Sequence, residues 1–213
     1  MRERVPRIVL SEKRKYFNEA MRRRWAASFL LLFLLFLTAA CGGNSLYKVG
    51  PRVATPLPER TGEARAGGII LRAVPLLTDE ESQRLFEANL PLGGLLPVRV
   101  QIRNESGAPL PLKRARFLVR DGAGQVWKMR SAKQAVGRIL EANEVTLYNP
   151  SSRKEFEERF RAHALDIETP LGPSEEREGL IFFQTPHKEA VESPRGLTLV
   201  IEKIPQPFEL RLN

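Results

Sequence analysis

A strict alternation of apolar and polar residues in one short segment constrains the fold of this chain more than any other feature. Between positions 98 and 103 the apolar side chains are Val98, Val100 and Ile102, and a polar or basic residue follows each of them. Successive side chains of an extended strand point to opposite faces, so this pattern predicts a strand with one face buried and the other in water. Half-buried strands of this kind are typical of antiparallel sheets.

Further apolar runs predict additional short strands. They lie at 69–74, 116–120, 125–129, 180–183, 197–201 and 208–212. The sequence Asp121-Gly122-Ala123-Gly124 joins two of these runs and predicts a hairpin with a loop of about three to five residues. The chain is therefore expected to be mainly β.

Two regions between these strands carry helical signals. Thr78 and Glu81 have the spacing of a capping box, which predicts a short helix that ends before Pro91. A helical insertion is expected at about 131–167. Its second helix is predicted to begin with another capping box, at Ser152-Arg153-Lys154-Glu155.

Several short strands interrupted by one helical insertion predict a small β-sandwich with α-helical elaboration. The segment Leu96–Met129, LPVRVQIRNESGAPLPLKRARFLVRDGAGQVWKM, resembles the immunoglobulin-like domains of secreted bacterial proteins. The resemblance lies in a strand that ends at Asn104 with a polar turn and in the later Asp-Gly hairpin, and Glu178–Phe183 resembles a further strand of such domains. It implies an immunoglobulin-like β-sandwich over 69–213 and no particular chemistry.

An apolar run near the start of the chain predicts export. Arg22-Arg23-Arg24 precede the run 26–40, AASFLLLFLLFLTAA, which has the charged, apolar and small-residue parts of a secretory signal. The 16 residues from Trp25 to Ala40 are fewer than the roughly 17–25 of a spanning helix. An uncleaved anchor and an ordinary cleaved signal stay as alternatives to lipid attachment.

The single cysteine of the chain, Cys41, follows this run directly. The ending Leu37-Thr38-Ala39-Ala40-Cys41 resembles the lipobox of bacterial lipoprotein signal peptides, with the departure that Thr38 stands where the family prefers Leu. The resemblance implies cleavage between Ala40 and Cys41, a lipid thioether on Cys41 and acylation, such as by palmitate, of the new N-terminus. By analogy with enterobacterial sorting, Gly42 favours the outer membrane over the inner membrane.

These features divide the chain into three parts. Residues 1–40 are expected to be a signal peptide with an extended or misassigned start, because Met21 begins a conventional signal by itself. Residues 41–68 hold the lipidated cysteine and a flexible tether rich in Gly and Pro. Residues 69–213 form the β-sandwich domain.

The net charge of +9 is concentrated in the predicted signal peptide. Residues 1–40 carry nine basic and three acidic side chains, which leaves 25 basic and 22 acidic side chains, a net charge of +3, in the rest of the chain. A charge so small and so mixed gives the exported domain little attraction for nucleic acid, so we exclude DNA and RNA as partners.

No residue pattern in the sequence predicts a catalytic residue, a metal site or a cofactor. His163 and His187 stand 24 positions apart, whereas metal ligands usually recur at short fixed spacings. There is no Gly-x-Ser-x-Gly sequence, and Gly122-Ala123-Gly124 lacks the later glycine of a dinucleotide-binding loop. Structural or solvated roles are expected for both histidines.

One predicted helix has features of a docking surface. Arg153, Phe156, Arg159 and Phe160 combine two aromatic rings with basic side chains on a short segment. The favoured interpretation is an amphipathic helix whose rings cover the sandwich. The alternative is a docking helix for a partner protein or an anionic lipid surface, against which the mixed charge of the segment argues.

The sequence thus predicts a lipid-anchored envelope lipoprotein with a non-catalytic binding or assembly module. Its expected partners are the membrane, through the lipid on Cys41, and other envelope proteins. Two alternatives stay open: a hydrolase or other enzyme of the envelope, and a structural accessory of a larger envelope complex.

Overall fold

The computed structural model describes residues 49–52, 56–145 and 150–213. The predicted signal peptide, with Ala40 and Cys41, lies outside these residues. The described residues belong to one compact unit that runs from Leu46 to Asn213. Within this described part of the chain, no helix combines the length and the apolar character that crossing a membrane requires.

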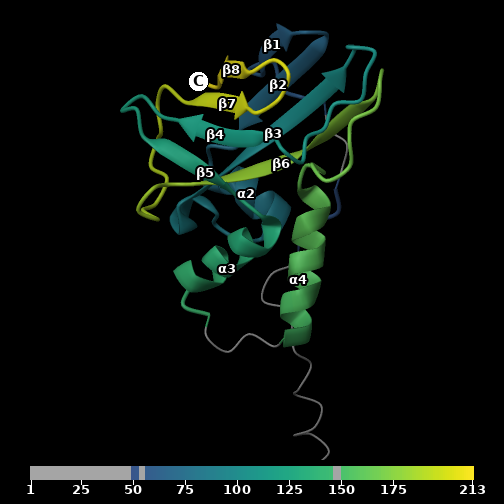
Figure 1. Cartoon of the computed structure of the whole chain (residues 1–213). Coiled ribbons are helices and arrows are strands. Elements are labelled where there is room, and N and C mark those ends of the chain that lie inside the picture. The colour runs from purple at the N-terminus through teal and green to yellow at the C-terminus, as the bar shows by residue number, and fades with distance from the viewer. Residues whose placement is uncertain (1–48, 53–55, 146–149) are drawn as a thin grey trace, which may run out of the picture. The chain divides into compact units, whose positions relative to one another are not determined.

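Eight antiparallel strands form one sheet in the order β1-β2-β3-β6-β5-β4-β7-β8 (Figure 1). The strands are β1 (Gly62–Ala66), β2 (Ile69–Pro75), β3 (Leu95–Asn104), β4 (Arg116–Arg120), β5 (Val126–Arg130), β6 (Glu176–Gln184), β7 (Thr198–Glu202) and β8 (Phe208–Arg211). The sheet curls until its first and last strands meet. A Cβ atom on Gly62 would lie 2.7 Å from the Arg211 carbonyl oxygen, so this approach of β1 to β8 requires a glycine.

The mainly β prediction is confirmed, whereas the immunoglobulin-like sandwich is not confirmed. The described strands belong to one nearly closed sheet instead of two separate sheets. A curled sheet encloses a core with its own inner face, so its strands need the same alternation of apolar and polar residues as the strands of a sandwich. The sequence pattern alone therefore does not distinguish the two arrangements.

The inner face of the sheet surrounds the first of two hydrophobic cores, which we call the inner core. The predicted alternation in β3 is confirmed: Val98, Val100 and Ile102 are buried, while Arg103 on the other face is exposed. The inner core includes Ile69, Leu71, Ala73, Leu96, Val98, Val100, Ile102, Phe117, Val119, Trp127, Ile181, Phe183, Leu199, Ile201, Phe208 and Leu210. These side chains come from the strands, and residues outside the strands, among them Leu110, Leu112, Leu165, Leu171 and Val191, complete this core.

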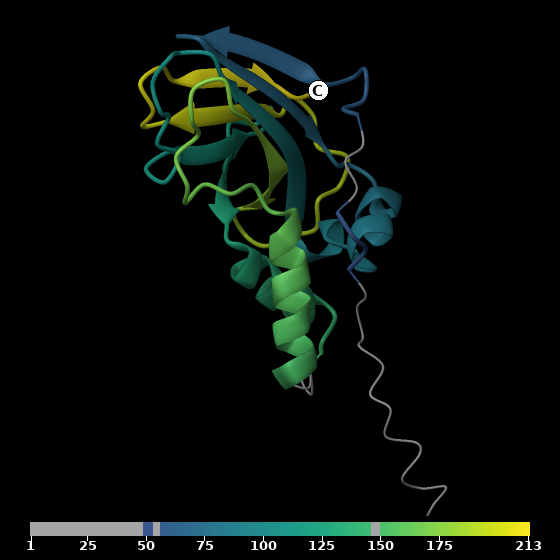
Figure 2. The ribbon, with the colours of Figure 1, turned by 90° about the vertical axis from the view of Figure 1, so that its right-hand side faces the viewer.

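Three helices cover the outer face at one end of the sheet and enclose the second core (Figures 1 and 2). They are α2 (Asp79–Phe86), α3 (Ala132–Ala142) and α4 (Pro150–His163); a short 3-10 turn, η1 (Pro91–Gly93), leads from α2 into β3. We call this second core the helical layer. It includes Val49, Phe86, Leu90, Leu95, Val136, Ile139, Leu140, Phe156, Phe160, Leu180 and Phe182.

Aromatic rings hold the helical layer to the sheet. The ring centroid of Phe160 on α4 lies 4.4 Å from that of Phe86 on α2 and 4.5 Å from that of Phe182 on β6. In β6 the alternation continues, because Leu180 and Phe182 belong to the helical layer whereas Ile181 and Phe183 belong to the inner core. Strand β6 is therefore buried on both faces and joins the two cores.

The helix starts agree only in part with the predicted capping boxes. The box at Thr78 is confirmed, since its hydroxyl accepts a hydrogen bond from the Glu81 backbone N–H. A second box, at Ser131, begins α3 and was not predicted. The box predicted at Ser152 is wrong, because α4 already begins at Pro150, a residue that favours the first position of a helix.

The segment 49–52, which we name the strap, contacts the helical layer. Val49 is buried in this core. The Gly50 backbone N–H donates to the Leu85 carbonyl oxygen at 3.0 Å, and the Gly50 carbonyl oxygen accepts from His163 Nε2 at 2.8 Å. The folded domain therefore includes the strap, which lies within the range that we predicted to be a tether.

A second part of the predicted tether, residues 41–68, is folded, because Gly62–Ala66 form strand β1. It pairs with β2 along its whole length, through a turn at Gly67 and Gly68, whose φ angles of 56° and 75° suit glycine. The strand places only the small side chains of Ala64 and Ala66 against the inner core. Such a weak apolar signal between glycines explains why sequence periodicity missed it.

Candidate binding pocket

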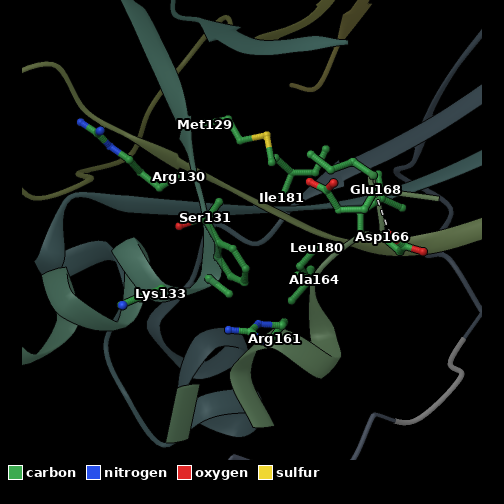
Figure 3. A pocket seen from close by; sticks show the side chains of 14 residues that line it. Met129, Arg130, Ser131, Lys133, Arg161, Ala164, Asp166, Glu168, Leu180 and Ile181 are labelled. Carbon is green, nitrogen blue, oxygen red and sulfur yellow. Dashed lines mark hydrogen bonds between the residues drawn. The ribbon is translucent and has the colours of Figure 1, made fainter. Parts of the chain in front are cut away.

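A pocket opens where β5 separates from β6 (Figure 3). The two strands are paired up to Arg130 and Phe182, after which the chain leaves β5 and enters α3. Beyond this point the chain that follows α4 lies beside β6, where the Leu165 N–H donates to the Leu180 carbonyl oxygen at 2.9 Å. The space between has a volume of about 490 Å³, within the roughly 300–1,000 Å³ of small-molecule sites.

The floor of the pocket is apolar and lies at the seam between the two cores. Leu180 and Phe182 reach it from the helical layer, and Ile181 reaches it from the inner core. Met129 and Ile167, both half-buried, extend the apolar surface toward the mouth. The floor therefore suits the apolar part of a ligand.

The helices supply basic groups to one side of the pocket. Lys133 extends from the first turn of α3 and Arg161 from the last turn of α4, and both are exposed (Figure 3). Within the described residues neither side chain has an ion-pair partner. Arg130, which also lines the pocket, donates from Nε to the Gln184 side chain at 2.7 Å.

Acidic groups line the opposite side, on the loop that follows α4 (Figure 3). Glu168 forms an ion pair with Lys113 at 2.8 Å, which raises the pKa of Lys113 above its ordinary value. Asp166 accepts hydrogen bonds from the backbone N–H groups of Glu168 and Thr169, at 2.9 and 3.3 Å. Hydrogen bonding to Thr169 lowers the pKa of Asp166, so its carboxylate is ionised and engaged within its own loop.

The pocket thus combines an apolar floor, two basic groups without described partners and two acidic groups that already have partners. This arrangement suits a ligand that is apolar at one end and anionic at the other. A metal ion would need different groups. In the described ranges, no set of three or more His, Cys, Asp or Glu side chains is placed to hold one.

The two histidines have separate structural surroundings. His163 is buried, contacts the Phe86 ring edge-on at a centroid distance of 5.3 Å and holds the strap. His187 lies in the loop after β6, where its backbone N–H donates to the Glu189 carboxylate at 2.9 Å. Both positions agree with the structural roles expected from the sequence.

The predicted docking helix covers the sheet with the rings that we had considered for a partner. Phe156 and Phe160 are almost completely buried in the helical layer and are not available to a docking protein. On the exposed face, Arg153 forms an ion pair with Glu157 on the next turn, at 3.0 Å. Arg159 is paired in the same way with Glu155. The two rings therefore cover the sheet, and a docking role of this helix stays a prediction that concerns its exposed face.

The basic pocket residues were missed because no sequence signal joins them. Lys133 and Arg161 stand 28 positions apart on different helices. Only the packing of α3 and α4 against β6 brings them to one pocket.

No protein-family model matches this chain, and neither does a curated protein or a solved structure.

Proposed function

We propose that the protein is a lipid-anchored lipoprotein of the bacterial envelope whose folded domain acts as a non-catalytic binding or assembly module. The observation that carries this proposal is the sequence Ala39-Ala40-Cys41 directly after an apolar run and three arginines. The small residues Ala39 and Ala40 would form the site at which a signal peptidase cleaves, and the thiol of Cys41 would carry the lipid. The outer membrane is the proposed location because Gly42 follows the cysteine.

The construction of the domain supports a binding role. Large side chains of the strands fill the interior of the curled sheet, so a ligand there would have to displace the core. The pocket at the β5–β6 seam, by contrast, opens to solvent beside exposed basic groups. The immunoglobulin-like relationship of Leu96–Met129 belongs to the same proposal and rests on the turn after Asn104 and the Asp-Gly hairpin.

The position of the strap adds a spatial consequence to the proposal. Eight Cα–Cα steps separate Cys41 from Val49, and an extended chain of that length spans at most about 26–29 Å. A domain that is anchored at Cys41 and holds Val49 in its core would therefore stay close to the bilayer. Partners within this reach would be other envelope proteins or molecules that leave the membrane.

Replacement of the cysteine tests the anchor. In the native host, Cys41→Ser should leave an uncleaved precursor and abolish metabolic labelling by an alkyne analogue of palmitate. Mass spectrometry of the wild-type protein should find an N-terminus at Cys41 that bears acyl chains. Thr38→Leu, which restores the residue that the lipobox family prefers, is the matched control and should be cleaved and labelled at least as well as the wild type.

Two results would contradict the lipid anchor. One is palmitate labelling that persists in Cys41→Ser. The other is a wild-type protein that retains residues 26–40 with an unmodified thiol, which would make it an inner-membrane protein held by its apolar segment.

A further inference from the structure

We propose that the pocket between β5, β6, α3 and α4 binds a small amphiphilic anion, a molecule with an apolar body and a single carboxylate or phosphate group. The inference deepens the proposed binding role of the domain and does not depend on the lipid at Cys41. It is carried by the joint position of an apolar floor and two basic groups (Figure 3).

The apolar body of the ligand would lie on the seam between the cores. Leu180 and Phe182 are buried residues of the helical layer, and Ile181 is a buried residue of the inner core, yet all three line the pocket. Contact of a hydrocarbon chain with this floor and with the half-buried Met129 and Ile167 removes apolar surface of the ligand and of these side chains from water, which stabilises the bound state.

The anionic head would lie at the basic side. Lys133 and Arg161 enter the same pocket from two helices, and neither has an ion-pair partner within the described part of the chain. The amino end of α3, at Ser131, lines the pocket as well, and no acidic residue occupies the first turn of this helix. A carboxylate or phosphate bound beside either group would therefore gain a charge-assisted hydrogen bond, in the field of a helix N-terminus.

The acidic residues of the pocket do not cancel this attraction. Glu168 is held by Lys113, and Asp166 is held by backbone N–H groups of its own loop. Arg177 lies 3.8 Å from the Asp166 carboxylate and adds a further positive charge on that side. A cationic amphiphile would find both carboxylates engaged, whereas an anionic one finds two basic groups available.

Photolabelling of the full chain in lipid nanodiscs tests the proposal. The probe is octanoate with a terminal diazirine, and labelled peptides are identified by mass spectrometry after irradiation. We expect labels within 129–133, 164–168 and 180–182. Unlabelled octanoate and octyl phosphate should compete at least tenfold better than octanol, which has the same chain and no charge. The better competitor of the two anions identifies the head group.

Substitution of the basic residues is the second measurement. The double variant Lys133→Gln, Arg161→Gln should weaken competition by octanoate at least tenfold. Both residues are exposed, so the melting temperature should stay near that of the wild type. Arg159→Gln is the matched control, since it removes a charge from the same helix outside the pocket and should change competition less than twofold.

Three outcomes would overturn the proposal: labels only outside the pocket, octanol as good a competitor as octanoate, or a double variant that binds octanoate like the wild type. The lipid anchor is judged separately. Absence of pocket labelling with intact palmitate on Cys41 removes only the pocket proposal, and octanoate binding by a protein without palmitate removes only the anchor.

Discussion

The inner core and the helical layer are built in different ways from the same chain. Strands supply most of the inner core, with aliphatic and aromatic side chains at every second position, so each strand shows its contribution in its own sequence. The helical layer collects rings and aliphatic groups from segments as far apart as Val49 and Phe182. A core assembled from local periodicity is visible in a sequence, whereas a core assembled from distant segments is visible only in the fold.

The two cores meet at β6, which has buried side chains on both faces. Gly179 of this strand contacts the chain that follows α4 so closely that a Cβ atom would lie 2.4 Å from the Leu165 Cα atom. A glycine is needed here because backbone, and not a movable side chain, occupies the space. The backbone after α4 can therefore approach β6 this closely only at a position without a side chain.

The largest effect is expected from a charge in the inner core. Val100→Asp places a carboxylate without a partner at a fully buried position, at a cost of several kcal/mol, and should abolish the cooperative unfolding transition seen by circular dichroism. Val126→Asp is the matched control, because Val126 is 39% exposed, and should change the stability by less than about 0.5 kcal/mol. A Val100→Asp protein that melts like the wild type would refute the inward direction of this side chain.

A smaller but still large effect is expected from the ring cluster of the helical layer. Phe160→Ala removes a fully buried ring that contacts Phe86 and Phe182, and should lower the free energy of unfolding by about 3–5 kcal/mol in urea titrations. Leu92→Ala, at a side chain that is 51% exposed, should have little effect. A loss in Phe160→Ala as small as that in Leu92→Ala would mean that the helical layer contributes little to stability. The protein would then depend on the inner core alone.

A local effect is expected where the strap joins the helical layer. His163→Ala leaves the Gly50 carbonyl oxygen without its hydrogen bond, at a cost of about 1–3 kcal/mol. The strap should then open without global unfolding, and trypsin should cleave after Arg52 faster than in the wild type. His187→Ala is the control and should leave the rate unchanged. Cleavage at the wild-type rate in His163→Ala would show that the buried Val49 side chain and the hydrogen bond from Gly50 to Leu85 hold the strap without His163.

The smallest effect is expected on the exposed face of α4. Arg159 and Glu155 form an ion pair with both side chains about half exposed, and such helical pairs contribute about 0.3–0.5 kcal/mol. Arg159→Gln should therefore lower the free energy of unfolding by no more than about 0.5 kcal/mol, and 1 M salt should reduce the difference. A loss above about 1 kcal/mol would mean that this ion pair stabilises the protein more than an exposed helical pair is expected to.

The sequence predicted the elements that carry their own periodic signal. The strand around Val100 and the capping box at Thr78 are both found where periodicity and capping chemistry placed them. Strand β1 was missed because alanines and glycines give no apolar contrast. The closing of the sheet at Gly62 was missed as well, because a close approach between distant strands leaves no local pattern.

The pocket illustrates the same difference at a functional scale. Met129 and Leu180 were each assigned correctly to a strand. Nothing in the sequence indicates, however, that β5 separates from β6 after the pair formed by Arg130 and Phe182. Lys133 and Arg161 are ordinary basic residues of amphipathic helices until the fold places them at one opening. A binding site formed where two elements pack together leaves no pattern in the sequence of either element alone.

The strap has a mechanical consequence for a domain held by its N-terminus. Drag on such a domain would pull on Val49, and the buried side chain together with the two hydrogen bonds at Gly50 would bear the tension first. Without them the pull would arrive at Gly62, the end of an outermost strand, and would peel β1 from β2 one hydrogen bond at a time. The strap would thus carry the tension itself, so that the pairing of β1 with β2 behind it is not loaded.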